Sequence, residues 1–273
     1  MQTPLKVATA LTIAGSDSGG GAGIQADLRT FAFHRVHGTS ALTAITAQNT
    51  LGVTRVDVLS AESVAAQIDA VVNDLGVGAL KTGMLVNREI IATVAGKLRA
   101  LPDVPCVVDP VMVSRAGSRL IDDAAVGALR ELLVPLASVL TPNRYEAQLL
   151  SGMSLYTLAD MEEAARRIHR LGARAVLVKG GGMTGDLRGT DVWFDGTSVE
   201  VLQGTVLETR NTHGTGCTLS AAITARLALG ESPLAAVRAG KHYVTEALRL
   251  PLALGQGNGP IGHFFPLMGS AAR

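Results

Sequence analysis

The sequence has little charge and no long run of apolar residues. Charged residues make up 17% of the 273 residues, and the formal net charge is +1 at pH 7. Proteins that bind nucleic acid usually carry a basic stripe and a high pI, and neither is present, so we expect no nucleic-acid partner. No apolar run approaches the ~20 residues that a transmembrane helix needs, so we also expect no membrane span.

Cysteine is equally scarce. Cys106 and Cys217 lie far apart and form no disulfide pattern. This usage is typical of a reducing compartment, and we expect a cytoplasmic protein. The apolar residues 5–14 resemble a short signal peptide, but they lead into a glycine loop and a helical pattern, which favours a strand. Disorder is not expected because 47% of the residues are hydrophobic and no highly charged tract interrupts them.

Short apolar runs alternate with stretches of helical periodicity. Strands are predicted at residues 7–14, 40–46, 79–81, 106–108, 138–140 and 175–178, with two short strands at 191–194 and 198–202. Between them, apolar residues recur at helical spacing, for example from Val64 to Leu75 and from Met161 to Leu171. Strands that are apolar throughout indicate a parallel sheet covered on both faces. We therefore predict one doubly wound α/β domain over residues 1–273, with ligands at the carboxyl ends of its strands.

A glycine-rich loop follows the first predicted strand. Five of the nine residues 15–23 are glycine, and a helix is predicted from about Ile24. Such a loop can hold an anion or a ring close to the backbone, so a ligand contact is favoured over a flexible turn. A P-loop is excluded because no lysine ends the loop. The dinucleotide fingerprint Gly21-x-Gly23-x-x-Ala26 is formally present, but the next strand ends without a carboxylate for a ribose.

A second glycine loop precedes a helix predicted over residues 218–229. It reads Asn211-Thr212-His213-Gly214-Thr215-Gly216-Cys217. The free N–H groups and the dipole of a helix start form an anion hole that suits a transferring phosphoryl group. We expect this position to lower the pKa of the Cys217 thiol, so that the thiolate accepts a proton from a substrate alcohol. The alternative is that Cys217 packs as a small hydrophobe, as Cys106 is expected to do.

Charged residues stand at or near the ends of three other predicted strands. Asp109 directly follows the strand at 106–108, and Glu146 lies three residues after Asn143, behind the strand at 138–140. Magnesium in nucleotide sites takes one or two carboxylates, so Asp109 and Glu146 are predicted to support it. A solvated or capping role is the alternative for each carboxylate. Lys179 ends another apolar run and is placed to reach phosphate, unless it only extends from the sheet edge to solvent.

Seven motifs, in order along almost the whole chain, together resemble one family. They are residues 14–27, 46–50, 81–84, 108–112, 141–143, 179–181 and 211–217. On these motifs the chain is similar to the hydroxymethylpyrimidine/phosphomethylpyrimidine kinases of thiamine biosynthesis, which belong to the ribokinase-like superfamily.

The resemblance implies a ribokinase-like three-layer α/β/α sandwich with a mostly parallel central sheet, and a homodimer. It implies ATP-dependent phosphorylation of 4-amino-5-hydroxymethyl-2-methylpyrimidine to the monophosphate and then the diphosphate, with Mg²⁺. It implies that the substrate is bound by Gln48, Gly15, Asp27, Met84 and Val111. It further implies that Asp109 and Glu146 support the metal, that Asn143, Thr212, Gly214, Thr215 and Gly216 serve the nucleotide and the anion hole, and that Lys179 and Cys217 are catalytic.

The role of Gln48 also has support from its chemistry. A neutral amide offers both a donor and an acceptor, which match the edge of an aminopyrimidine. The alternative is a structural glutamine at a strand end.

Three other functions stay open at the level of the sequence. Pyridoxine or pyridoxal also has a flat ring with a hydroxymethyl arm, and similar proteins phosphorylate it. A Cys–His hydrolase could use Cys217 and His213, although no third orienting residue is evident. A non-catalytic binding protein would leave Cys217 and Lys179 unexplained. Gly182 and Asn258 depart from the histidines that family members often have, so closure of the loop after Lys179 stays in question.

Overall fold

In the computed structural model, which describes residues 5–112, 121–250 and 252–268, nine strands form one sheet in the order β3-β2-β1-β4-β5-β6-β7-β8-β9. The strands are β1 Thr9–Asp17, β2 His37–Asn49, β3 Gly52–Val58, β4 Ala79–Thr82, β5 Cys106–Val108, β6 Val139–Leu140, β7 Val176–Val178, β8 Asp191–Phe194 and β9 Val199–Leu202. Six neighbouring strands pair in parallel, in the order β2, β1, β4, β5, β6 and β7. The strands β3, β8 and β9 pair antiparallel at the two edges of the sheet.

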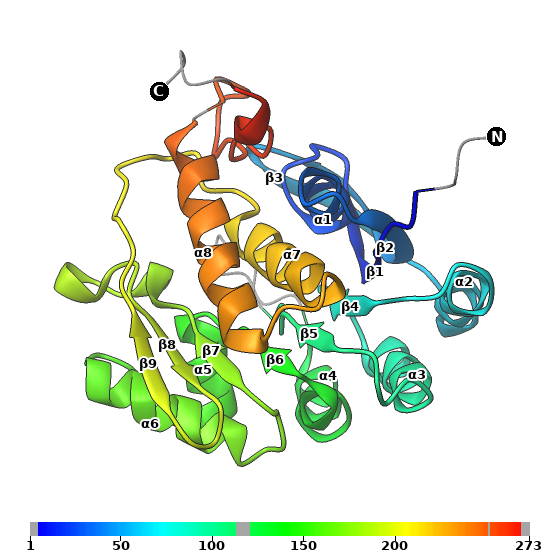
Figure 1. Cartoon of the computed structure of the whole chain (residues 1–273), viewed down its shortest axis with the longest axis horizontal. Helices are drawn as coiled ribbons and strands as arrows, with labels where there is room; N and C mark the ends of the chain where they lie inside the picture. The colour runs from blue at the N-terminus through cyan, green and yellow to red at the C-terminus, as the bar shows by residue number, and fades with distance from the viewer. Residues whose placement is uncertain (1–4, 113–120, 251, 269–273) are drawn as a thin grey trace.

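Helices cover both faces of this sheet (Figure 1). The helices are α1 Gly23–Phe33, α2 Ala61–Asp74, α3 Arg88–Arg99, α4 Asp123–Ala128, α5 Arg144–Ser151, α6 Leu158–His169, α7 Thr215–Ala228 and α8 Pro233–Arg249, with short turns at Leu129–Leu133, Val134–Leu136, Gly180–Gly182, Gly185–Leu187 and Phe265–Leu267. Helices α1, α7 and α8 lie on one face, and α2 to α6 lie on the other (Figure 1). The predicted three-layer α/β/α sandwich is thus confirmed.

The central strands are apolar throughout because each face of the sheet packs against a separate core. In β5, Cys106 and Val108 belong to the core beneath α2 to α6, whereas Val107 belongs to the core beneath α7 and α8. Full burial of an aliphatic side chain contributes about 1.5–3 kcal/mol, so both layers are held by many such side chains. Cys106 is buried, as predicted.

The edge strand β3 was not among the predicted strands. All seven of its residues are exposed, and it pairs only with β2. Val53, Val56 and Val58 do not alternate regularly with polar residues, so the pattern gives no burial signal. Strand β2 is also longer than predicted and reaches Asn49, and α7 begins at Thr215, three residues before its predicted start.

The parallel strands bring several helix starts to one edge of the sheet. Helix α1 follows β1, and α5 follows β6, so both begin at the carboxyl edge. A capping box stabilises the start of α5: the side chain of Asn143 accepts from the backbone N–H of Glu146, whose carboxylate accepts from the Asn143 N–H at 2.8 Å. Within the described ranges, none of the helices combines the length and apolar character that a bilayer span requires.

Candidate active site

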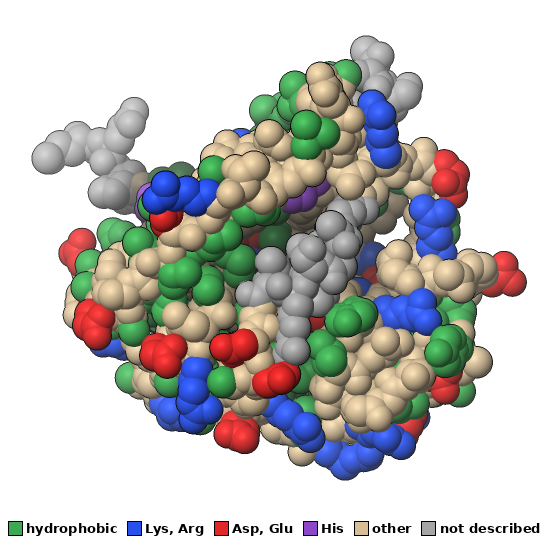
Figure 2. All heavy atoms as spheres, turned by 180° about the vertical axis from the view of Figure 1, so that it is seen from behind, with side chains coloured by type: hydrophobic (Ala, Val, Ile, Leu, Met, Phe, Trp, Pro, Cys, Tyr) green, Lys and Arg blue, Asp and Glu red, His purple; other side chains and the backbone are tan. Residues whose placement is uncertain are grey.

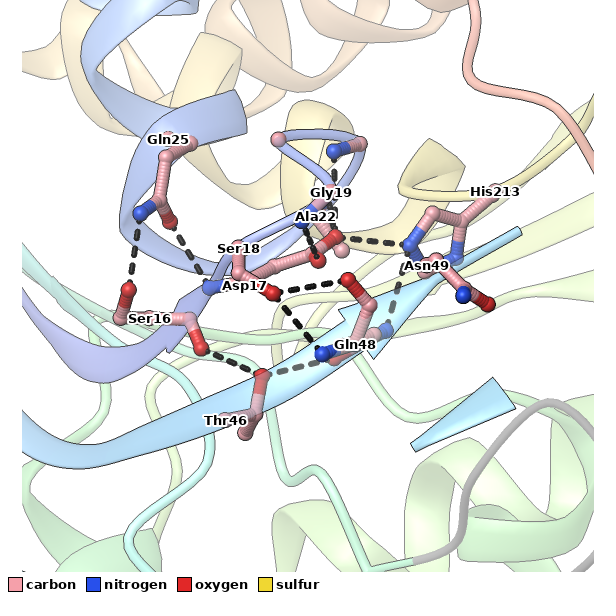
Figure 3. Close-up of polar contacts among 12 residues, drawn as sticks. Ser16, Asp17, Ser18, Gly19, Ala22, Gln25, Thr46, Gln48, Asn49 and His213 are labelled. Carbon is pink, nitrogen blue, oxygen red and sulfur yellow. Dashed lines mark hydrogen bonds and ion pairs between the residues drawn. The ribbon is translucent and has the colours of Figure 1, made fainter. Parts of the chain in front are cut away.

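Asp17, the last residue of β1, organises the first glycine loop. Its Oδ1 accepts from the Gly19 N–H at 2.8 Å, and its Oδ2 accepts from the N–H groups of Gly21 at 3.0 Å and Ala22 at 2.8 Å. His213 Nε2 lies 2.8 Å from the same Oδ2 (Figure 3). Burial alone would raise the pKa of Asp17, but the hydrogen bonds from His213 and Ala22 lower it, so the carboxylate is ionised.

The two glycine loops touch each other at Gly21 and Gly214. Gly214 is the N-cap of α7 and has a φ of +83°, which favours glycine. A Cβ at Gly214 would lie 1.8 Å from the Gly21 carbonyl oxygen, so no other residue fits without displacing a loop. The second predicted loop therefore places the start of α7 directly against the first loop.

Asp109, Glu146 and Lys179 form a charged cluster beside the start of α7. Lys179 Nζ lies 3.0 Å from Asp109 Oδ1, and both groups are largely buried. A Cβ at Gly216 would lie 3.4 Å from Lys179 Nζ and 3.8 Å from Asp109 Oδ2, so the predicted anion hole lies over this ion pair. Burial alone would lower the pKa of Lys179, but the negative charges of Asp109 and Glu146 outweigh burial and raise this pKa, which keeps Lys179 cationic.

The carboxylates of the cluster have the chemistry of a magnesium site. Burial raises the pKa of Glu146 to about 7, the charge of Lys179 opposes this rise, and the charge of Asp109 adds to it. A divalent cation would relieve this crowding of buried negative charge, since carboxylate oxygens are the ligands that Mg²⁺ prefers. Glu146 also fulfils the alternative capping role, because its Oε2 accepts from the Asn143 N–H. The residues therefore fit the ion, with part of Glu146 already engaged.

Cys217 lies in the first turn of α7 and is partly exposed. The expectation of a lowered thiol pKa is wrong for this structure: burial raises the pKa of Cys217 to about 11, although the nearby Lys81 ammonium opposes the rise. A helix start contributes about 0.3–1 kcal/mol to an anion, which is smaller than the desolvation of a buried thiolate. At neutral pH the thiol is therefore protonated.

Lys81 and Asp27 form an ion pair beneath this part of the site. Lys81 Nζ lies 2.9 Å from Asp27 Oδ2, both side chains are fully buried, and Thr12 Oγ1 donates to the same oxygen at 2.6 Å. The other oxygen, Oδ1, has no hydrogen-bond partner among the described residues. Asp27 was predicted to lie near a substrate ring, but its carboxylate lies below the exposed surface and supports Lys81.

The other residues that were predicted to contact the substrate ring lie near one another only in part. A Cβ on Gly15 would lie 2.5 Å from Met84 Cε, so the Met84 side chain rests on the Gly15 backbone. Gln48 is half-buried at the end of β2, and Val111 is half-buried two residues after Asp109. Gly15, Met84 and Gln48 thus lie near the ends of neighbouring strands, where a flat ring could be bound.

The remaining residues that were predicted to bind the nucleotide also have partners within the protein. Asn143 caps α5 and pairs with Lys179 as an isolated parallel bridge, so its amide oxygen is already used. The Thr212 carbonyl accepts from the hydroxyl of Thr215 at 3.1 Å. The Thr212 Oγ1 is buried and has no partner within the described part of the chain. This hydroxyl is therefore available to a ligand.

Two residues of the site, Lys81 and Asp17, were not singled out as functional residues at the level of the sequence. Lys81 has the same signal as Lys179, a lysine at the end of an apolar strand, which could have identified it. Asp17 stands inside the first glycine loop, but its partner His213 is 196 residues away, and no local pattern joins them. The contact of His213 Nε2 with Asp17 also removes support for a Cys–His hydrolase, because this ring nitrogen faces Asp17.

The fold and this site together place the chain among the small-molecule kinases of the ribokinase-like fold. It is similar to the pyridoxal kinase of Bacillus subtilis, solved as an ADP complex, with a TM-score of 0.89 and 41% identity over 97% of this chain and 100% of that one. It is also similar to a Clostridium difficile phosphomethylpyrimidine kinase, with a TM-score of 0.79 and 41% identity over 89% and 99% of the two chains.

The sequence comparisons are more specific. The phosphomethylpyrimidine kinase family model matches residues 17–262. A hydroxymethylpyrimidine/phosphomethylpyrimidine kinase of Synechococcus elongatus is 62% identical over 263 residues, which cover 96% of this chain and 100% of the relative. The chain belongs to the phosphomethylpyrimidine kinase family.

Proposed function

We propose that the chain phosphorylates the hydroxymethyl arm of 4-amino-5-hydroxymethyl-2-methylpyrimidine with ATP, and then phosphorylates the monophosphate. The observation that carries this proposal is the convergence of two glycine loops, the Asp109–Lys179 pair and Gln48 at one edge of the sheet. Gln48 supplies the donor and acceptor that an aminopyrimidine edge requires. The N–H groups at the start of α7 and Lys179 supply positive charge for the transferring group.

In the first step, the hydroxymethyl oxygen forms a bond to the γ-phosphorus as the bond from that phosphorus to the ADP oxygen breaks. Lys179 and the start of α7 stabilise the charge on the phosphoryl oxygens. Asp109 and Glu146 would hold Mg²⁺, which supplies further positive charge to the phosphates. Cys217 lies at the helix start, where its thiolate form, a minor species at neutral pH, accepts the hydroxyl proton as the new bond forms. Both cysteines are free, which suits a reducing compartment such as the cytoplasm.

A pyridoxal kinase activity is the second candidate, because the B. subtilis structure with the same fold is named for it. ADP release should be measured with hydroxymethylpyrimidine, its monophosphate, pyridoxine, pyridoxal and ribose. We expect the pyrimidine and its monophosphate to be preferred by kcat/KM. Preference for pyridoxal would replace the proposed substrate and leave the kinase site unchanged.

Gln48→Ala is expected to raise the KM for the pyrimidine by about ten- to hundredfold and to leave the KM for ATP nearly unchanged. Removal of one partner of a buried hydrogen bond costs about 1–3 kcal/mol. Initial rates over a matrix of both substrates measure the two constants. Equal weakening of both substrates would mean that Gln48 acts only in the structure.

We also propose a homodimer formed through the hairpin of β2 and β3. The edge strand β3 exposes Val53, Val56 and Val58, and β2 exposes Ile45, which is paired with Asp57. Edge strands of monomeric proteins are usually protected by charged side chains or by another element that covers them. In β3 the two charged residues, Arg55 and Asp57, pair with each other. A second copy of the chain is the occupant that this apolar edge and the family resemblance favour.

Val56→Asp is expected to convert the dimer to a monomer, because it would bury an unpaired carboxylate in the interface. Light scattering after size-exclusion chromatography measures the mass. Leu75→Asp is the matched control, since Leu75 is 50% exposed and Val56 is 44% exposed, but Leu75 lies at the end of α2. A dimer that survives Val56→Asp would place the interface elsewhere.

A further inference from the structure

The side-chain amide of Gln48 lies between two polar groups from different parts of the chain. One of its terminal atoms lies 3.3 Å from His213 Nε2, and the other lies 3.1 Å from Thr46 Oγ1 (Figure 3). The oxygen and nitrogen of an amide are distinguished by their hydrogen-bond partners, so the network decides which atom faces which group. The orientation matters because Gln48, under the proposed function, is the residue that recognises the edge of the ring.

The protonation of His213 follows from Asp17. The Asp17 carboxylate accepts from three backbone N–H groups, at Gly19, Gly21 and Ala22, and these groups can only donate. An ionised carboxylate with such partners requires another donor at its fourth contact, the one 2.8 Å from His213 Nε2. His213 therefore carries its proton on Nε2 and donates to Asp17.

A protonated Nε2 cannot accept from an amide NH₂. If the Gln48 atom that faces His213 were its nitrogen, two donors would meet at 3.3 Å. We infer that the Gln48 carbonyl oxygen faces His213, that the Gln48 NH₂ faces Thr46, and that His213 is a positioning residue which fixes this order. The Nε2–H is then shared between Asp17 and the Gln48 oxygen.

Thr46 supports the same order independently. Its hydroxyl has one hydrogen and lies 2.8 Å from the Ser16 carbonyl oxygen, which can only accept. The Thr46 hydroxyl therefore donates to Ser16, and its lone pair accepts from the Gln48 NH₂ at 3.1 Å. In this hydrogen-bond network, each donor faces an acceptor only when the Gln48 oxygen is on the His213 side.

The arrangement links ring recognition to the phosphoryl site. The backbone N–H of His213 donates to the Gly259 carbonyl at 3.1 Å, and His213 directly precedes Gly214 at the start of α7. The same residue thus anchors the anion hole and orders the Gln48 amide. An amide of fixed orientation accepts heterocycles whose donor and acceptor stand in one order, and it disfavours those with the opposite order.

The first test is the tautomer of His213 in the wild-type enzyme, measured by long-range ¹H–¹⁵N correlation with His213→Gln used for assignment. We expect protonation at Nε2 at pH 7–8. An Nδ1–H tautomer would overturn the inference. This measurement needs no substrate, so its outcome is independent of the proposed function.

The second test is a double-mutant cycle with the heterocycle that the wild-type enzyme prefers. His213→Phe is expected to raise its KM about tenfold in the wild-type background and less than twofold in the Gln48→Ala background. His213→Gln, which keeps a donor, should restore the KM to within about threefold, and His242→Phe on the exposed surface of α8 should change nothing. Equal effects of His213→Phe in both backgrounds would show that His213 does not act through Gln48.

Discussion

Lys179→Ala is expected to lower turnover roughly 10³-fold with the pyrimidine alcohol and with its monophosphate alike. Cations that stabilise the charge of a transferring phosphoryl group contribute about 10³–10⁵ to kcat. Lys179 is the cation paired with Asp109 at 3.0 Å, and the Gly216 backbone lies next to it. Both reactions transfer the same group, so both should lose this stabilisation. ADP release with each acceptor measures the effect.

The same substitution leaves Asp109 buried without its partner. An unpaired buried charge typically costs about 3–5 kcal/mol, so the melting temperature should fall as well. Lys179→Ala combined with Asp109→Asn removes both charges and should recover much of the stability without recovering turnover. Lys97→Ala is the matched control, since it breaks a Lys–Asp pair on the exposed side of α3. Turnover within tenfold of wild type would contradict a role for Lys179 in transfer.

The architecture could be predicted from the sequence because the buried strands have a strong apolar signal. Strands β4 to β8 were predicted to within about one residue, and the parallel pairing of β4 to β7 followed from burial on both faces. The exposed strand β3 could not be predicted in this way, because no residue in it is buried. Its pairing with β2 depends on backbone hydrogen bonds, which do not select apolar residues.

The predicted site residues lie at or near the strand ends, but the partners of these residues were less predictable. Asp109 and Lys179 are 70 residues apart and were placed together by the rule that parallel strands end at one edge. The Asp17–His213 contact needs the exact approach of two loops, which depends on Gly21 and Gly214 having no side chains. The raised pKa of Cys217 likewise depends on its surroundings in the fold, among them the charges of Lys81 and Asp27, whereas the sequence shows only a helix start.

Cys217→Ala is expected to slow phosphorylation of the alcohol by roughly 10²-fold, at the lower end of the range for a lost general base. With a pKa of about 11, the thiol is ionised in about one molecule in 10⁴ at pH 7, which corresponds to about 5 kcal/mol. A lost general base typically costs about 3–5 kcal/mol, and the scarcity of the thiolate places the expected loss at the lower end of this range.

The pH dependence provides the sharper test of this base. The thiolate fraction increases tenfold for each pH unit below the pKa of about 11, so wild-type kcat with the alcohol should rise between pH 7 and pH 9. Cys217→Asp replaces the thiol by a carboxylate that is already ionised, so its rate should be nearly constant over this range. A flat wild-type profile would mean that no ionisation of Cys217 limits the reaction.

The second phosphorylation distinguishes a role of Cys217 as general base from a role in shaping the start of α7. The monophosphate arrives with its acceptor oxygens already ionised, so it needs positive charge and no proton acceptor. Cys217→Ala should therefore slow the alcohol about 10²-fold and the monophosphate less than about fivefold, whereas Lys179→Ala slows both. ADP release is measured with each acceptor supplied separately at saturating ATP, and Cys106→Ala in the core is the matched control. If Cys217→Ala slows both acceptors by the same factor, Cys217 acts by shaping the helix start beside Gly216, and its assignment as the base must be withdrawn.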